Sequence, residues 1–251
     1  MSHHGLPCWY ELASTDLAAS QKFYAELLGW SWQDAGMEGM TYMLAKSPSA
    51  MVAGLFSSEM GRLPGWLTYF AVESADESAA LAASAGAQVQ MPPTDIPGTG
   101  RFALLADPQG ASFGILQPLP MPDGSGGGAF NPAGLGCGQW NDLATSDVEA
   151  ALGFYGKIFG WSVSRSMPMG PDRTYSILAS GATDIGGVFK GEAAAPFWKP
   201  YFGVASAEAA KAKVSALGGT VQSGPDPVPG GIYTLQCKDP SGVIFALVGP
   251  M

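Results

Sequence analysis

Two short segments of the chain place a tryptophan two positions before an acidic residue. Trp9-Tyr10-Glu11 in the first half returns as Trp140-Asn141-Asp142 in the second half. Because side chains alternate between the two faces of a strand, each tryptophan shares a face with its acid. Burial beside an aromatic ring raises the pKa of an acid and suits it to general acid or base chemistry. Glu11 is therefore the first catalytic candidate and Asp142 the second.

The same carboxylates also have a structural interpretation, which the sequence leaves open. They could accept hydrogen bonds from the backbone or from tyrosine hydroxyls and so complete the core. For Trp9 and Trp140 the corresponding alternative is packing in the core. Asp142 ranks below Glu11 as a catalytic candidate because one copy of a duplicated protein often loses its activity.

Several other kinds of site are excluded by residue type. The histidines are His3 and His4, near a terminus that is expected to fray, so a Ser-His-Asp triad is ruled out. The three cysteines have an odd count and no close pairs, which argues against a disulfide framework or a zinc knuckle. We interpret them as small, mostly buried thiols. They are Cys8, Cys137 and Cys237.

Charge and hydropathy restrict the partners. The net charge of −9 argues against nucleic acid and anionic membranes, which need basic patches. No apolar run approaches the roughly 20 residues of a membrane span, and the first residues do not resemble a signal peptide. We expect a cytoplasmic protein with a small-molecule ligand, as a monomer or homodimer.

The repeat extends over nearly the whole chain, in the same order and at similar spacing, which indicates a duplicated fold. Between the copies lies a segment rich in proline and glycine, typical of a linker. The expected organisation is a first domain over 5–117, a linker over 118–133 and a second domain over 134–249. The other repeated segments are Phe23-Tyr24 with Phe154-Tyr155, Gly29-Trp30-Ser31 with Gly160-Trp161-Ser162, and Asp107-Pro108-Gln109-Gly110 with Asp239-Pro240-Ser241-Gly242.

Each half reads twice as a strand, a helix and three strands. Thr15-Asp16 is a helix start, apolar residues follow at helical spacing, and Gly29 ends the helix. The fold class is α+β, with four βαβββ units in two domains, and the phenylalanine-tyrosine pairs are expected in the core. In the first half the predicted strands are 6–13, 30–34, 40–46, 51–56, 66–72, 87–91, 100–106 and 111–116, and the second helix is 75–85.

With these motifs the chain resembles the vicinal oxygen chelate superfamily, which contains glyoxalase I, the bleomycin-resistance proteins and the extradiol dioxygenases. It is most similar to the tandem glyoxalase-like "hydroxylase" proteins of bacteria. The resemblance implies curved sheets around cavities, with the Trp9 face directed inward. It also implies that Tyr69, Tyr201 and Lys199 face inward, so the expected ligand-binding residues are Trp9, Tyr69, Trp140, Tyr201 and Lys199.

The metal ligands of the family do not carry over. The first-strand ligand falls at Trp9 and Trp140, and indole has no lone pair for a metal. The final-strand glutamate falls at Gly114 and Ala246. A third position falls at about Leu67 or Lys199, and Asp184 stands alone near a fourth. Because transition metals in this fold bind imidazole and carboxylate together, we predict no metal and no cofactor.

Three functions remain open, and the sequence does not settle whether the protein is an enzyme. The first is a metal-independent protein that binds a carbonyl or aromatic metabolite, with acid or base chemistry at Glu11. The second is sequestration of a drug or metabolite, as in bleomycin resistance. The third is metal-dependent glyoxalase or lyase activity, against which the missing ligands argue. If the halves exchange units, Trp9 and Glu11 share a cavity with Lys199 and Tyr201; otherwise they share it with Tyr69.

Overall fold

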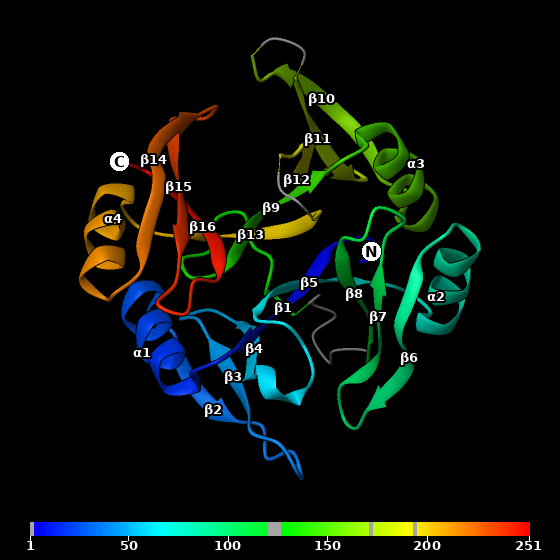
Figure 1. Cartoon of the computed structure of the whole chain (residues 1–251), viewed down its shortest axis with the longest axis horizontal. Helices are drawn as coiled ribbons and strands as arrows, with labels where there is room; N and C mark the ends of the chain where they lie inside the picture. The colour runs from blue at the N-terminus through cyan, green and yellow to red at the C-terminus, as the bar shows by residue number, and fades with distance from the viewer. Residues whose placement is uncertain (1–2, 120–126, 171–172, 193–194) are drawn as a thin grey trace. The chain divides into compact units, whose positions relative to one another are not determined.

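In the computed structural model, four βαβββ modules follow one another along the chain (Figure 1). The structure describes residues 3–119, 127–170, 173–192 and 195–251. Part of the predicted linker, residues 120–126, lies outside these residues. The α+β fold with a repeated unit, predicted from the sequence, is confirmed.

The bounds of the elements are as follows. Module 1 contains β1 (Pro7–Ser14), α1 (Leu17–Leu28), β2 (Ser31–Asp34), β3 (Tyr42–Lys46) and β4 (Met51–Ser57), followed by a short 3-10 helix, η1 (Ser58–Met60). Module 2 contains β5 (Gly65–Ala71), α2 (Ala75–Ser84), β6 (Gln88–Ile96), β7 (Gly100–Ala106) and β8 (Ser112–Pro118). Module 3 contains β9 (Gly138–Thr145), α3 (Val148–Phe159), β10 (Ser162–Pro168), β11 (Thr174–Ser180) and β12 (Thr183–Lys190). Module 4 contains β13 (Phe197–Gly203), α4 (Ala207–Ala216), β14 (Thr220–Val228), β15 (Ile232–Lys238) and β16 (Ile244–Gly249).

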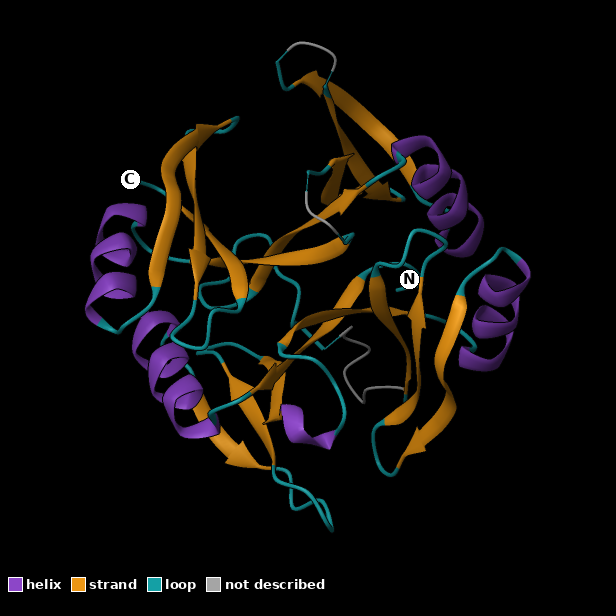
Figure 2. Ribbon diagram, viewed as in Figure 1, coloured by secondary structure: helices purple, strands orange, loops and turns teal. Residues whose placement is uncertain are grey.

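The strands form two mixed sheets, with the orders β2-β3-β4-β1-β5-β8-β7-β6 and β10-β11-β12-β9-β13-β16-β15-β14. In every module the first strand runs parallel to the last. The third strand of each module pairs antiparallel with the second and with the last. Figure 2 shows each helix lying against strands of its own module. None of the helices in the described parts of the chain is long and apolar enough to cross a membrane.

The chain packs into two compact units that combine modules from different halves. The 1–4 unit is built from residues 9–66, 127–140 and 199–251, so modules 1 and 4 supply most of it. The 2–3 unit takes in the described residues of 1–8, 67–126 and 141–198. Helix α1 lies beside α4 in the first unit, and α2 lies beside α3 in the second.

Helix ends follow the signals in the sequence. The Asp16 carboxylate accepts a hydrogen bond from the backbone N–H of Ala19 at 2.9 Å, which satisfies an otherwise unpaired donor at the start of α1. Gly29 ends the helix in the left-handed conformation, with φ of 72°, where a glycine avoids the steric cost of a side chain. Asp147 and Gly160 repeat this arrangement in α3.

The repeated phenylalanine-tyrosine and aspartate-proline motifs meet in the core, as the 1–4 unit illustrates. Tyr24 Oη donates to Asp239 Oδ2 at 3.2 Å, and Trp66 Nε1 donates to Tyr24 Oη at 3.1 Å. The other oxygen of Asp239 accepts from the backbone N–H groups of Ser241 and Val243, each at 2.9 Å. One carboxylate therefore holds its own turn and a helix that is distant in sequence.

The 2–3 unit contains the same network. Tyr155 Oη donates to Asp107 Oδ2 at 3.0 Å and accepts from Trp198 Nε1 at 2.9 Å. Burial raises the pKa of Asp107, and backbone N–H groups oppose part of this shift; the same causes raise the pKa of Asp239. Both tyrosines are buried, which confirms their predicted place in the core.

One predicted boundary is wrong. The sequence suggested that a strand over 87–91 stops before Pro92-Pro93, but β6 continues to Ile96. Strand β6 lies at the edge of its sheet, where a proline removes no ladder hydrogen bond on the open side. The pairing with β7 shifts register between Met91 and Thr94, so the prolines sit in an irregular part of the ladder.

Candidate functional site

Glu11 lies at the centre of a polar cluster in the 1–4 unit. Tyr42 Oη, from β3, donates to Glu11 Oε1 at 2.8 Å. Trp9 Nε1 donates to the same tyrosine hydroxyl at 3.2 Å. Arg62, which follows η1, forms an ion pair with Glu11 Oε2. We call Trp9, Glu11, Tyr42 and Arg62, with the adjacent Phe56, the Glu11 cluster.

The Arg62 guanidinium is also fixed by main-chain atoms. Its Nη2 donates to the carbonyl oxygen of Glu11 at 3.1 Å and to that of Gly65 at 3.4 Å. Its central carbon lies 4.7 Å from the ring centroid of Phe56, within cation-π range. The side chains of Arg62 and Glu11 are 22% and 12% exposed, so this ion pair lies at the protein surface but is largely covered.

A glycine creates the space for Tyr42. Strands β3 and β4 are antiparallel neighbours, and a Cβ added at Gly54 would collide with the ring and hydroxyl of Tyr42. The ring stacks on Phe56, with centroids 6.2 Å apart. Burial raises the pKa of Tyr42, and the charge of Glu11 adds to the rise. Tyr42 therefore stays protonated at neutral pH, and its hydroxyl donates a hydrogen bond to the Glu11 carboxylate.

Asp142 has a similar setting in the 2–3 unit. Tyr175 Oη, from β11, donates to Asp142 Oδ1 at 2.5 Å. A Cβ at Gly187 would collide with the Tyr175 ring, and that ring stacks on Phe189 with centroids 6.0 Å apart. The segment between β12 and β13 reads Gly191-Glu-Ala-Ala-Ala-Pro and contains no arginine. We call Asp142, Tyr175, Gly187 and Phe189 the Asp142 cluster.

Lys199, Tyr201 and Trp140 come together in the 1–4 unit. Lys199 Nζ donates to Gln236 Oε1 at 2.6 Å and lies 5.3 Å from the ring centroid of Tyr201. Gln236 Nε2 donates to Tyr201 Oη at 3.2 Å, and Trp140 packs against Tyr201 and Ala246. Tyr69 lies in the other unit, beside Gly114.

The compact units combine module 1 with module 4, whereas each sheet contains the strands of the two modules of one half. Both pairings that the sequence left open therefore stay predictions. Trp9 and Glu11 belong to the same unit as Lys199 and Tyr201, whereas Tyr69 and Asp142 belong to the 2–3 unit. That these groups line common ligand cavities stays a prediction.

The donors at the family's metal-ligand positions do not fit a metal ion. The Trp9 indole offers only an N–H, which it gives to Tyr42. A Cβ at Gly114 would collide with the ring of Tyr69, so a coordinating side chain has no space there. Ala246 packs against Tyr201. Among the described residues, no three of histidine, cysteine, aspartate or glutamate gather in an arrangement that could hold a metal.

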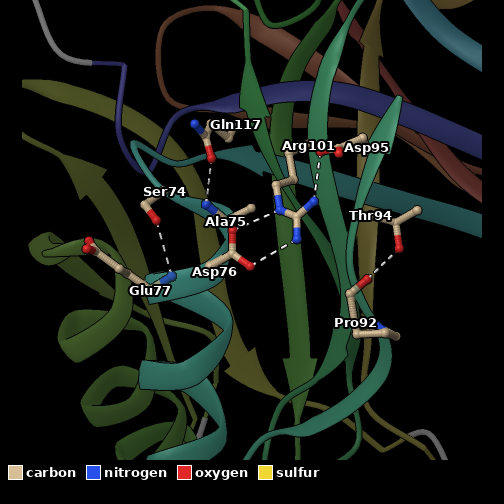
Figure 3. Close-up of polar contacts among 9 residues, drawn as sticks. All are labelled: Ser74, Ala75, Asp76, Glu77, Pro92, Thr94, Asp95, Arg101 and Gln117. Carbon is tan, nitrogen blue, oxygen red and sulfur yellow. Dashed lines mark hydrogen bonds and ion pairs between the residues drawn. The ribbon is translucent and has the colours of Figure 1, made fainter. Parts of the chain in front are cut away.

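A surface pocket of about 360 Å³ lies in module 2, apart from the residues that the sequence singled out. Arg101 lines this pocket, and Figure 3 shows its guanidinium joined to two carboxylates. The guanidinium bonds Asp76 from α2 at 2.8 and 3.1 Å and Asp95 from β6 at 2.7 Å, and it lowers the pKa of Asp76. Arg101 thus connects a helix start to an edge strand. The pocket is lined by Asp95, Ile96, Gly98, Gly100, Arg101, Gln117, Pro118 and Leu119.

Several residues around these sites were not expected from the sequence, namely Tyr42, Phe56, Arg62, Tyr175, Gly187, Phe189 and Gln236. A signal for Tyr42 existed, because a tyrosine stands near the start of both β3 and β11. Arg62 and Gln236 carry no such signal, since each stands in only one copy of its module.

The family is decided by a match over both halves. The model of the Glyoxalase/Bleomycin resistance protein/Dioxygenase superfamily matches residues 8–115 and again residues 139–247. The chain belongs to this superfamily. Superfamily relatives include CFP32 of Mycobacterium tuberculosis, which carries the provisional name glyoxylase. It is 32% identical over 256 residues, which cover 98% of this chain and 95% of CFP32.

A second relative is the anthracycline biosynthesis protein DnrV of Streptomyces peucetius, 30% identical over 97% of this chain and 93% of its own. Among solved structures, the Mn(II)-bound glyoxalase from Novosphingobium aromaticivorans has a TM-score of 0.68 at 16% identity, covering 99% of this chain and 83% of its own. The catechol dioxygenase BphC has a TM-score of 0.71 at 15% identity, covering 99% and 88%. At these identities the structural likeness shows the fold alone.

Proposed function

We propose that this member of the superfamily binds an aromatic carbonyl metabolite at the Glu11 cluster and that Glu11 moves a proton at the carbon next to the carbonyl. The observation that carries the proposal is the setting of Glu11. It is a partly exposed carboxylate, fixed on one oxygen by Tyr42 and on the other by Arg62. A base held in one orientation is what general base catalysis requires.

The chemical step needs only groups of the chain. The Glu11 carboxylate takes a proton from the C–H bond next to the ligand's carbonyl. The electron pair of that bond forms a C=C bond, and the carbonyl becomes an enolate. Return of the proton to the same carbon regenerates the ligand, and delivery to another position isomerises it. Such proton transfer contributes about 10²- to 10⁴-fold in rate.

The ligand class rests on the walls of the site and on one relative. Trp9 and Phe56 supply aromatic surface around the carboxylate. The name of DnrV places that protein in anthracycline biosynthesis, and anthracyclines are polycyclic aromatic compounds with several carbonyl groups. We extend this ligand class, though no particular compound, to the present chain.

Metal independence is part of the proposal. It is supported by the indole at position 9 and by the Tyr69 ring that fills the space at Gly114. Metal analysis of untagged protein tests it, because stoichiometric nickel, zinc, iron or manganese would contradict it.

The second function, sequestration without turnover, is favoured by the Asp142 cluster. There an aspartate takes the place of Glu11, and its buried carboxylate accepts a hydrogen bond from Tyr175. Such an acid-tyrosine pair can have a purely structural role.

Glu11→Gln separates the two functions. The probe is 2-tetralone, a neutral bicyclic aromatic ketone, whose protons next to the carbonyl are followed by ¹H NMR in D₂O. Binding is followed by tryptophan fluorescence. We expect the wild type to accelerate deuterium uptake and the variant to bind without exchange. Equal exchange by wild type, variant and buffer, with binding retained, would favour sequestration.

A further inference from the structure

In the proposed step Arg62 only fixes the Glu11 carboxylate and has no contact with the ligand. We propose that Arg62 binds the ligand's carbonyl oxygen and stabilises the negative charge that forms there when Glu11 takes the proton. This inference rests on the proposed function and adds a catalytic residue to it.

Arg62 is held by contacts that do not involve the Glu11 side chain. Its Nη2 is bound to the main-chain carbonyls of Glu11 and Gly65, and its face lies on Phe56. Gly61, directly before it, has φ of 95°, a left-handed conformation that turns the chain at the end of η1. A cation that is already fixed before the reaction needs no reorganisation when charge develops.

The guanidinium of Arg62 has more hydrogen-bond donors than its contacts in the structure use. A guanidinium has five N–H groups in a planar fork. One Nη1–H is used on the Glu11 carboxylate and both Nη2–H groups are used on carbonyl oxygens. Among the residues that the structure describes, the Nε–H and the second Nη1–H of Arg62 have no acceptor. The side chain is 22% exposed, and the proposal requires that this exposed part includes one of these donors.

The charge balance between Glu11 and Arg62 also suits the proposed role. Before the reaction the charges of Glu11 and Arg62 cancel, which suits a neutral ligand. As the proton moves to Glu11, one negative charge leaves the carboxylate and arrives at the ligand oxygen, still beside Arg62. The cation therefore loses one partner while it gains another, and the gain exists only along the reaction path. The substrate class that fits is a neutral ketone or aldehyde with an acidic neighbouring C–H.

Two exposed apolar side chains lie close to Arg62 in the sequence and are suited to contact an apolar ring system. Leu63 is 87% exposed and Met60 is 57% exposed. Side chains of this kind at the border of a polar site can contact the ring system of a ligand whose oxygen is bound further inside.

The test compares Arg62→Gln, Arg62→Lys and Glu11→Gln with wild type in 2-tetralone exchange and binding. Arg101→Gln is the matched control, because it removes an exposed arginine from outside the site. 2-Naphthol, a planar mimic of the enol, is the competing ligand. Circular dichroism confirms the fold of each variant.

We expect Arg62→Gln to lower the exchange rate about 10²- to 10³-fold, the usual effect of losing one oxyanion donor. Its affinity for 2-tetralone should change less than threefold, and Arg62→Lys should keep part of the rate. Wild type should bind 2-naphthol more tightly than 2-tetralone, and Arg62→Gln should lose this preference.

Two results would overturn the role of Arg62 while leaving the proposed function intact. One is exchange by Arg62→Gln at the wild-type rate; the other is a loss of exchange that only matches a loss of binding. If Arg62→Gln does not fold, the lysine variant and the 2-naphthol preference of wild type still decide the matter. Failure of the proposed function looks different, because wild type itself would then not exchange.

Discussion

The Glu11 and Asp142 clusters are two copies of one frame, and they differ in what has been added to it. Both place an acid on the first strand, a tyrosine on the third and a glycine on the fourth, with a phenylalanine stacked on the tyrosine. Only the first copy has Arg62 in the segment that follows, and its acid is partly exposed, whereas Asp142 is buried. The comparison shows that both copies share the acid and the tyrosine, and that the first copy adds an arginine and a more exposed acid. In the proposed function, this addition distinguishes the reactive copy from the structural one.

The largest difference between the two clusters is expected when the acid of each is replaced. Glu11→Gln should lower 2-tetralone exchange about 10²- to 10⁴-fold, the range of general base catalysis. The fold-loss in exchange rate caused by Asp142→Asn should be at least ten times smaller than the fold-loss caused by Glu11→Gln. Both are measured by ¹H NMR in D₂O. Equal losses in the two variants would mean that the copies are not specialised.

The next effect concerns the glycines that make room for the tyrosines. Gly54→Ala and Gly187→Ala should each lower the free energy of unfolding by about 1–3 kcal/mol, because the added methyl group displaces a packed ring. Urea denaturation measures both. Exchange should fall only in Gly54→Ala, since Tyr42 orients Glu11. A loss of exchange in Gly187→Ala as well would contradict the assignment of the active copy.

A third prediction concerns what the two units share. Asp107→Asn and Asp239→Asn should each cost about 1–3 kcal/mol, because the buried tyrosine hydroxyl loses its acceptor. The folded pKa of each aspartate is raised, so the folded state binds its proton more tightly than the unfolded state. The stability from that proton is present below the unfolded pKa, about 3.9, and is lost as pH rises through the folded value.

The pH dependence of this third prediction has a definite sign. Wild type should gain stability relative to each asparagine variant as pH falls from 7 towards 4, and the two units should behave alike. Urea denaturation at both pH values checks it. A wild-type advantage that shrinks on acidification would show that the carboxylate, and not the acid, is the favoured buried form.

The smallest effect is expected outside both clusters. Arg101→Gln removes an exposed connection between α2 and β6, and exposed ion pairs contribute little. Its exchange rate should equal that of wild type, and its melting temperature should change little. A large loss of exchange would mean that the module 2 pocket takes part in the reaction.

The sequence predicted the features that local rules decide. The helix starting at Asp16 and ending at Gly29, the repeated modules, and the shared face of Trp9 and Glu11 all follow from spacing along one element. The pairing of module 1 with module 4 could not be predicted, because it depends on contacts such as Tyr24 with Asp239, which are distant in sequence.

The partners of the acid were equally out of reach. Tyr42 meets Glu11 only because of the register of three neighbouring strands, and Arg62 comes from a segment whose counterpart in the second half has no arginine. A one-dimensional pattern carries neither register nor the path of an irregular segment. The tyrosine that stands in both copies indicated a shared role in the sequence. That role could be assigned only from the structure, in which Gly54 leaves space for the Tyr42 ring.

The most direct test of the account is 2-tetralone exchange by protein from which metal has been removed with a chelator and verified by elemental analysis. The account predicts that the metal-free wild type takes deuterium into the probe at its full rate and that Glu11→Gln does not. Exchange that stops on chelation and returns with a divalent ion would contradict it.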